Sequence, residues 1–209
     1  MSKVGHIKVY CHLIVNNIKY FLTYHFQFYN CPAMYHERQR LQFCALHVLN
    51  NLFQAEVFSK PELDDICYSL NPDATINPHK SMFGWGNYDV NVLTMALQLK
   101  DYQFIWFDKR KDLNLLDLAT IYGIVINKFY KPKCLGLEIP IKRRHWLAVR
   151  KIDENFYNLD SKLDVPEYIG NDEHLIKFLK FELAVSTTEL FIVVSNSVPE
   201  DSWMKVDAG

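Results

Sequence analysis

The hydrophobic pattern of the chain changes near Lys100, and this change restricts what the sequence can fold into. Between Tyr35 and Lys100, apolar residues recur every three to four positions, which is the period of an amphipathic helix. After it, short apolar runs are separated by polar or turn residues, which is typical of β-strands. Helices followed by strands predict an α+β domain, with a helical part packed on a mostly antiparallel sheet of about five strands.

Three helices are predicted before Lys100. The first runs from Cys44 to Phe53, where apolar residues form one stripe and Cys44 lies at the helix N-terminus. The second begins at the capping box Ser59-Lys60-Pro61-Glu62 and ends at Asn71-Pro72. The third covers residues 89–99, with Asp89 as its candidate N-cap.

The second half of the chain is predicted to supply the sheet. A fourth helix is expected at residues 173–181, before the last strand. Residues 128–144 contain Pro132, Gly136 and Pro140, so they are interpreted as an insertion loop. The apolar runs that predict strands cover residues 104–107, 121–126, 146–149, 156–159 and 190–194.

The composition excludes several classes of protein. The 209 residues are 49% apolar, which is enough for one ordinary core. A net charge of −1 gives no long-range attraction to nucleic acid or anionic lipid, so we expect no nucleic-acid partner. The apolar stretch from Val9 to Val15 is much shorter than the ~20 residues of a membrane span, so we expect no transmembrane segment.

The five cysteines form an odd set with no CxxC pair and no regular spacing. This pattern indicates neither a disulfide framework nor a zinc site, and we expect no metal and no cofactor. Cysteines of this kind favour a reducing compartment. We therefore expect a cytoplasmic protein. As a separate expectation, the protein is a monomer.

Cys44 is the candidate nucleophile. A thiol attacks only as the thiolate, and the free N–H groups and dipole of a helix N-terminus lower the pKa of a thiol placed there. Cys67, by contrast, lies inside an amphipathic stripe, and the other three cysteines lie in irregular or strand-like surroundings. The competing interpretation for any one cysteine is a small buried hydrophobic residue.

His145 is the candidate general base, and Asp160 is the candidate residue that orients its imidazole. His145 begins a predicted strand directly after a basic loop, so its side chain can face a cleft. If Asp153-Glu154 form a hairpin turn, residue 160 pairs with residue 147, which brings Asp160 near His145. Alone, Asp160 would be interpreted as an ordinary carboxylate at a strand end.

Attack on an amide also needs donors for the oxyanion. These are commonly the N–H of the nucleophile and a side-chain amide. Gln39 and Gln42 both precede Cys44, and the residues alone do not choose between them. The competing interpretation for either glutamine is a loop residue that faces solvent.

Two blocks of the sequence contain the candidate residues together with their neighbours. The first block is Tyr35-His36-Glu37-Arg38-Gln39, Cys44-Ala45-Leu46-His47-Val48-Leu49-Asn50-Asn51-Leu52 and Phe58-Ser59-Lys60-Pro61-Glu62-Leu63. The second is His145-Trp146-Leu147-Ala148-Val149-Arg150-Lys151 and Phe156-Tyr157-Asn158-Leu159-Asp160-Ser161. These blocks resemble the Josephin family of deubiquitinases, and the resemblance covers about residues 34–195 and is to the short single-domain Josephin type.

This resemblance implies a papain-like fold and a thiol-dependent hydrolase that cleaves the (iso)peptide bond after the C-terminal glycine of ubiquitin. It implies Cys44 as the nucleophile and His145 as the base. The third catalytic position is Asn in some members and Asp in others, and here it is Asp160. The glutamine five positions before the cysteine, which is Gln39, is implied for the oxyanion hole.

Trp85 and Trp146 are candidates for the walls of a channel that admits the Gly-Gly end of ubiquitin and rejects bulkier residues. Packing in the core explains two tryptophans equally well. The expected partners are ubiquitin and ubiquitinated proteins.

The expected organisation is a weakly ordered N-terminal extension (residues 1–30), a catalytic domain (31–197) and a short C-terminal tail (198–209). Two rival functions are a papain-like peptidase that acts on another substrate and a ubiquitin-binding or scaffold module with low or conditional activity.

Overall fold

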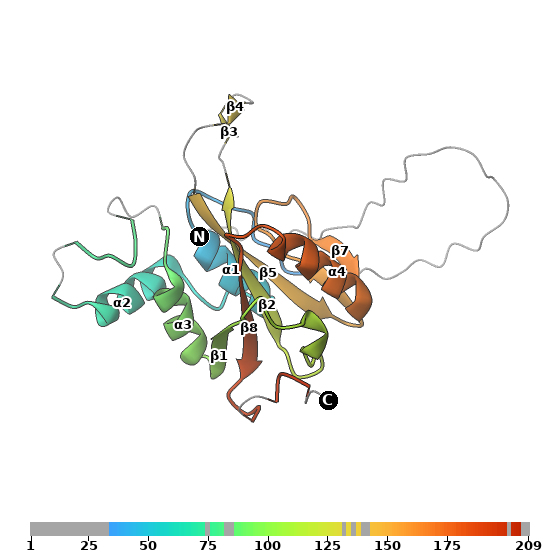
Figure 1. Ribbon diagram of the computed structural model, residues 1–209. Helices are drawn as coiled ribbons and strands as arrows, with labels where there is room; N and C mark the ends of the chain where they lie inside the picture. Colours follow the sequence, from blue (N-terminus) through green and yellow to red (C-terminus); the bar gives the residue numbers. More distant parts are fainter. Residues whose placement is uncertain are drawn as a thin grey trace.

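The computed structural model describes residues 34–73, 76–81, 86–130, 133–134, 137–138, 143–199 and 202–205. The predicted N-terminal extension therefore lies outside the described residues. The helices are α1 (Cys44–Phe53), α2 (Lys60–Leu70), α3 (Val90–Gln98) and α4 (Asp172–Leu183), with a 3-10 turn η1 (Leu113–Leu115) (Figure 1). The strands are β1 (Tyr102–Trp106), β2 (Gly123–Tyr130), β3 (Lys133–Cys134), β4 (Leu137–Glu138), β5 (Arg143–Ile152), β6 (Asn155–Asn158), β7 (Glu167–Gly170) and β8 (Glu189–Ser195).

Six of these strands form one sheet in the order β1-β8-β2-β5-β6-β7, and every pairing is antiparallel. The strands β3 and β4 form a separate two-stranded ladder. The predicted α+β class with an antiparallel sheet is thus confirmed. The sheet has one strand more than expected, because β7 was not predicted.

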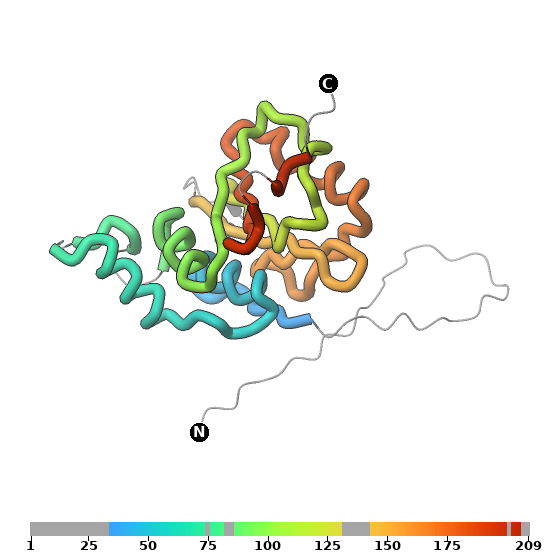
Figure 2. The backbone as a smooth tube through the Cα atoms, turned by 90° about the horizontal axis from the view of Figure 1, so that it is seen from below, coloured from blue at the N-terminus to red at the C-terminus, as the bar shows by residue number. Residues whose placement is uncertain are grey.

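Helices cover both faces of the sheet, as Figures 1 and 2 show. Alternate residues of the central strands point to opposite sides, so Val125 and Ala148 contact the layer of α1 to α3, while Ile126 and Leu147 contact the layer of α4. Burial on both faces explains why the central strands are continuous apolar runs. Within the described ranges, no helix is long and apolar enough to cross a bilayer.

The predicted helix starts at Ser59 and Asp89 are confirmed. The N–H of Ser59 donates to the Glu62 carboxylate at 2.7 Å, which completes the capping box before α2. The Asp89 carboxylate accepts from two backbone N–H groups in the first turn of α3. The C-terminal end of α1 is bonded to the sheet, because the Arg150 side chain on β5 donates to the Leu52 carbonyl at 2.6 Å.

The hairpin of β5 and β6 has the predicted register. Ile152 pairs with Asn155 around the turn, and Val149 pairs with Asn158. The N–H of Leu159 continues the ladder by donating to the Ala148 carbonyl at 2.8 Å. The next residue, Asp160, therefore lies beside the part of β5 that follows His145.

The prediction of an insertion loop at residues 128–144 has the wrong bounds at both ends. Strand β2 continues to Tyr130 and β5 begins at Arg143, and Lys128 pairs with His145 across them. The proline and glycine residues suggested a loop, but the flanking residues satisfy their backbone groups by pairing with each other. His145 therefore lies two residues inside a strand rather than at its start.

The described part of the C-terminal tail packs against the body of the protein. Trp203 is buried and its ring meets Phe107 edge-on, with 6.5 Å between ring centroids. The N–H of Lys205 donates to the Leu115 carbonyl at 2.7 Å. Residues 202–205 thus extend the core on the α4 side of the sheet.

Candidate active site

Cys44 is the first residue of α1 and is only 5% exposed. Its sulfur accepts backbone N–H bonds from Trp146 on β5 and from Ala45. The helical bonds of α1 begin with the N–H of His47, which donates to the Phe43 carbonyl at 2.9 Å. The N–H of Cys44 itself therefore lies in the first turn, where helical N–H groups have no acceptor within the helix.

Burial raises the pKa of the Cys44 thiol. The N–H bonds from Trp146 and Ala45 and the positive charge of Lys162 act in the opposite direction, but they do not outweigh burial. The helix N-terminus is where the sequence predicted it, yet the lowered thiol pKa expected from it is wrong. The resting thiol is therefore protonated at neutral pH.

His145 is 1% exposed, and its Nε2 lies 2.6 Å from Oδ1 of Asp160. Burial lowers the pKa of His145, although the bond to Asp160 acts against this. Burial would raise the pKa of Asp160, but the bonds from His145 and from the N–H of Lys162 lower it overall. The pair is thus a neutral imidazole that donates from Nε2 to a carboxylate.

The other nitrogen of this imidazole is available to accept a proton. With the hydrogen on Nε2, the lone pair lies on Nδ1, which is buried and has no hydrogen-bond partner among the described residues. The Cys44 sulfur lies against the N–H of Trp146, the residue next to His145. The fold thus brings the N-terminus of α1, strand β5 and the segment after β6 to one place.

The structure places the two candidate glutamines differently. The N–H of Gln39 donates to the Ser161 carbonyl at 2.6 Å, and its side-chain Nε2 donates to the Leu41 carbonyl at 3.1 Å. The Oε1 atom of Gln39 is buried and without a partner in the described part of the chain. Gln39 therefore lies between the segment that carries Asp160 and the loop that leads to Cys44.

The backbone of Gln42 is instead joined to the segment that precedes α3. Its carbonyl accepts from the N–H of Asn87 at 2.9 Å, and the residue forms an isolated bridge with Gly86. Gly86 has a φ of +95°, and a Cβ atom on it would lie 2.5 Å from the Gln42 carbonyl oxygen. Only glycine fits at this crossing.

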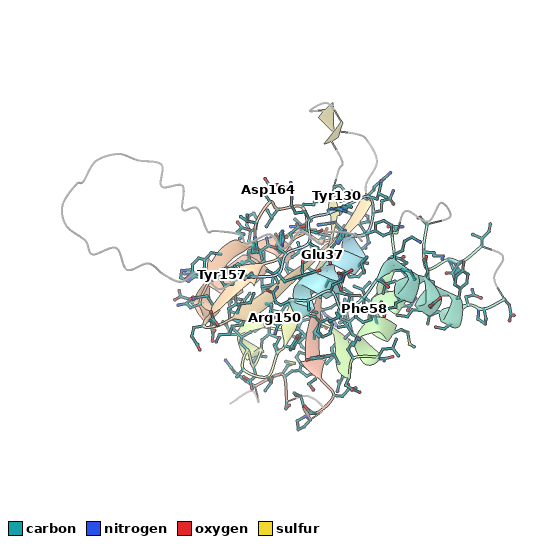
Figure 3. All side chains as sticks on the ribbon, turned by 180° about the vertical axis from the view of Figure 1, so that it is seen from behind. Glu37, Phe58, Tyr130, Arg150, Tyr157 and Asp164 are labelled. Atoms are coloured by element: carbon teal, nitrogen blue, oxygen red, sulfur yellow. The ribbon has the colours of Figure 1, made fainter. Side chains whose placement is uncertain are left out.

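A buried polar network fixes the loop before α1. Asn51 binds both the N–H and the carbonyl of Glu37, at 2.6 and 3.2 Å, and also donates to the Leu159 carbonyl at 3.0 Å. The Glu37 carboxylate accepts from His47 at 2.6 Å and from the Tyr35 hydroxyl. Figure 3 shows Glu37 beside α1. One asparagine thus connects the loop of Gln39, the helix of Cys44 and the residue before Asp160.

Sequence reasoning gave these network residues no role. A signal was present, because Asn50-Asn51 are two poor helix formers on a helix that is otherwise strongly apolar. Buried asparagines need partners for their amides, and in α1 those partners include Glu37 in the preceding loop and Leu159, the residue after β6.

Replacing Glu37 with Gln is expected to reduce stability by about 2 kcal/mol at neutral pH, because the carboxylate accepts several hydrogen bonds. Burial opposes ionisation, but the bonds from His47 and Tyr35 lower the pKa of Glu37 below its ordinary value of 4.5. A carboxyl with a lower pKa in the folded state stabilises above its unfolded pKa and loses that contribution as the pH falls through the folded pKa. Urea unfolding of both proteins should show the difference shrinking below pH 4.5.

Glu154→Gln is the control for this prediction, because that side chain is 92% exposed. It should leave stability unchanged at each pH. A difference between Glu37→Gln and the natural protein that stays constant into acid would show that the Glu37 charge does not stabilise the fold.

The two candidate tryptophans have different outcomes. Trp85 lies outside the described residues. Trp146 is buried, its indole donates to the Tyr88 carbonyl at 3.2 Å, and its ring packs against the stacked rings of Phe104 and Phe191. Its backbone N–H faces the Cys44 sulfur, while its side chain occupies the core.

Two residues beside the site were also missed by sequence reasoning. The Tyr130 ring meets the His145 ring edge-on, with centroids 5.7 Å apart, and the Lys162 ammonium group lies over the face of Tyr130. The available signal was a cation two positions after the predicted carboxylate. Figure 3 shows Tyr130 toward the top of the view, at the end of β2.

No group of three or more His, Cys, Asp or Glu side chains is arranged to hold a metal ion in the ranges that the structure covers.

Comparison with known proteins gives a consistent result. The family model described as Josephin matches residues 39–194. Josephin-2 from Homo sapiens is 45% identical over 178 residues, which cover 84% of this chain and 94% of that protein. A Josephin-like protein from Drosophila melanogaster is 46% identical over 165 residues, covering 78% of this chain and 74% of that protein. Ataxin-3 from Homo sapiens is 30% identical over 170 residues, covering 77% of this chain and 45% of that protein.

Proposed function

Because the chain belongs to the Josephin family, we propose that it is a cysteine-dependent deubiquitinase that hydrolyses the (iso)peptide bond after the C-terminal glycine of ubiquitin. One observation supports the chemistry most directly. His145 is fixed by Asp160 through Nε2, while its Nδ1 is left with a lone pair in the region where the Cys44 sulfur lies.

Catalysis begins with proton transfer from the Cys44 thiol to Nδ1 of His145. The thiolate attacks the carbonyl carbon of the terminal glycine, and the oxyanion is bound by the N–H of Cys44 and the side-chain amide of Gln39. The imidazolium then donates its proton to the leaving amine, and a thioester remains on Cys44. His145 then deprotonates a water molecule that attacks the thioester, and the imidazolium returns that proton to the Cys44 sulfur as the C–S bond breaks, which releases ubiquitin with a free carboxylate.

The resting charges suit this sequence of steps. Both the thiol and the imidazole are neutral at rest, because burial disfavours the charged form of each. Asp160 stays ionised and stabilises the imidazolium that forms during the reaction. The base is thus ready to accept a proton when a substrate carbonyl is in place.

The proposal also covers the domain bounds, the oligomeric state, the partners and the compartment of the enzyme. We place the catalytic domain at residues 31–197 and propose that it acts as a monomer on ubiquitin and ubiquitinated proteins. Cys44 and Cys67 are both free thiols, which supports a reducing compartment such as the cytoplasm.

The proposal is tested with ubiquitin that carries a C-terminal electrophile. The natural protein and Cys67→Ala should each form one covalent adduct, and Cys44→Ala should form none. A generic peptide substrate is incubated in parallel. Peptide turnover without ubiquitin labelling would identify a peptidase with another substrate, and binding of ubiquitin without labelling would identify a binding module.

Asp160→Ala is expected to lower kcat by roughly 10- to 100-fold and to change KM little, because Asp160 orients the imidazole without contacting the substrate. Steady-state kinetics on a ubiquitin conjugate measure both constants. Asp164→Ala is the control, since that carboxylate lies on the same loop and is paired with the exposed Arg38. An unchanged kcat in Asp160→Ala would remove this residue from the catalytic set.

A further inference from the structure

Lys162 lies at the candidate active site although no step above uses it. Its backbone N–H donates to Oδ1 of Asp160 at 2.9 Å, the same oxygen that binds His145. Its ammonium group lies over the face of the Tyr130 ring, and that ring contacts His145 edge-on. Lys162, Tyr130, His145 and Asp160 are therefore each in contact with two others of the four. Two contacts at opposite ends of the residue therefore fix Lys162 relative to the catalytic groups.

The position of Lys162 affects the charge state of the Cys44 thiol. Asp160 acts against the thiolate of Cys44, and Lys162 favours it. Lys162 in turn interacts electrostatically with both groups. The titratable and charged groups that face this region from the surrounding elements are His36 before α1, Lys128 and Tyr130 on β2, Arg143 and His145 on β5, and Asp160 and Lys162 after β6.

Lys128 is the other lysine of this set, and it is already paired. Its ammonium group lies 2.8 Å from both carboxylate oxygens of Glu182 on α4. Glu182 partly offsets the charge of Lys128, although Lys128 still acts on His145 and Lys162. Lys162 is instead directed toward the ring beside the site, so its charge acts there.

We propose that Lys162 is a positioning residue of this active site, whose ammonium group, held over Tyr130, offsets the negative charge of Asp160 and so favours the thiolate of Cys44. Asp160 orients the imidazole of His145, but its negative charge disfavours the nearby thiolate of Cys44. A fixed cation compensates for this conflict and leaves the His145–Asp160 bond in place. The inference rests on the proposed function for its biological meaning, although the thiol chemistry can be measured without ubiquitin.

The test is the rate at which iodoacetamide alkylates Cys44, followed by mass spectrometry at that residue from about pH 6 to pH 9. Lys162→Gln should lower the rate at neutral pH by about fivefold, and Lys162→Arg should keep the natural rate because it keeps the charge. Lys162→Met, which keeps the aliphatic stem, should behave like Lys162→Gln. Lys177→Gln on α4, which removes an exposed lysine paired with Glu173, is the control and should have no effect.

Two further readings separate charge from shape. Partial burial lowers the pKa of Lys162 to about 8, so the difference between the natural protein and Lys162→Gln should narrow above that pH. High salt should also reduce the difference, because screening weakens the interaction of charges that water reaches. A merely structural role for Lys162 would produce neither dependence.

The proposal is overturned if Lys162→Gln and the natural protein have the same pH profile, or if Lys162→Arg is as slow as Lys162→Gln. Either result is independent of ubiquitin. If the natural protein fails to react with the ubiquitin electrophile while Lys162 still controls alkylation, the proposed function fails and the role of Lys162 stands.

Discussion

Replacing His145 with Gln is expected to lower deubiquitination by at least about 10³-fold, because in the proposed mechanism His145 both accepts the thiol proton and donates to the leaving amine. Gln has nearly the volume of His and can still donate to Asp160, so the buried position stays filled. The measurement is turnover of a ubiquitin conjugate, together with the Kd for ubiquitin. Turnover should collapse while the Kd changes little.

His174→Gln is the matched control, because it makes the same change on the exposed surface of α4. It should retain natural turnover. The assignment of His145 as the base is wrong if the His145→Gln protein keeps more than roughly a tenth of the natural rate, since loss of a general base costs 10²-fold or more.

Replacing Asn51 with Leu is expected to destabilise the protein by about 3 kcal/mol, because it leaves the N–H and carbonyl of Glu37 and the carbonyl of Leu159 without their partner. For a chain of this size the expected fall in Tm is roughly 6–12 °C. Thermal and urea unfolding measure the two quantities. The side chain is completely buried, so water cannot replace the lost bonds without local opening.

The control for Asn51 is Gln98→Leu, which replaces an exposed amide near the end of α3 with the same apolar residue. Its expected effect is within about 0.5 kcal/mol. A Tm for Asn51→Leu within 2 °C of the natural protein would mean that the network contributes less than ~1 kcal/mol.

Local patterns predicted the elements whose chemistry lies within a few residues. The capping box at Ser59, the N-cap at Asp89 and the start of α1 all depend on neighbours in the sequence, and all three are confirmed. The β5–β6 register is also confirmed, because a hairpin with a short turn fixes which residues pair. The hairpin register by itself therefore predicts that Asp160 lies near His145.

Patterns failed where distant pairing or burial decides the outcome. Strand β7 has four residues, lies at the edge of the sheet and is largely exposed, so it carries no apolar alternation to recognise. The proline and glycine residues between them predict a loop at the ends of β2 and β5, because the pairing of Lys128 with His145 leaves no mark on either local pattern. The direction of the Cys44 pKa was also misjudged, because burial depends on how α1 packs against β5.

The crossing of Gln42 and Gly86 has a thermodynamic consequence for substrate binding. Because these backbones are bonded two residues before Cys44, a shift of the segment before α3 would displace the loop that carries Gln42. In the proposed enzyme, a molecule that changes the affinity for ubiquitin by shifting this segment would have its own affinity changed by ubiquitin by the same factor. Gly86 would then link a segment more than forty positions after Gln42 to substrate binding at Cys44.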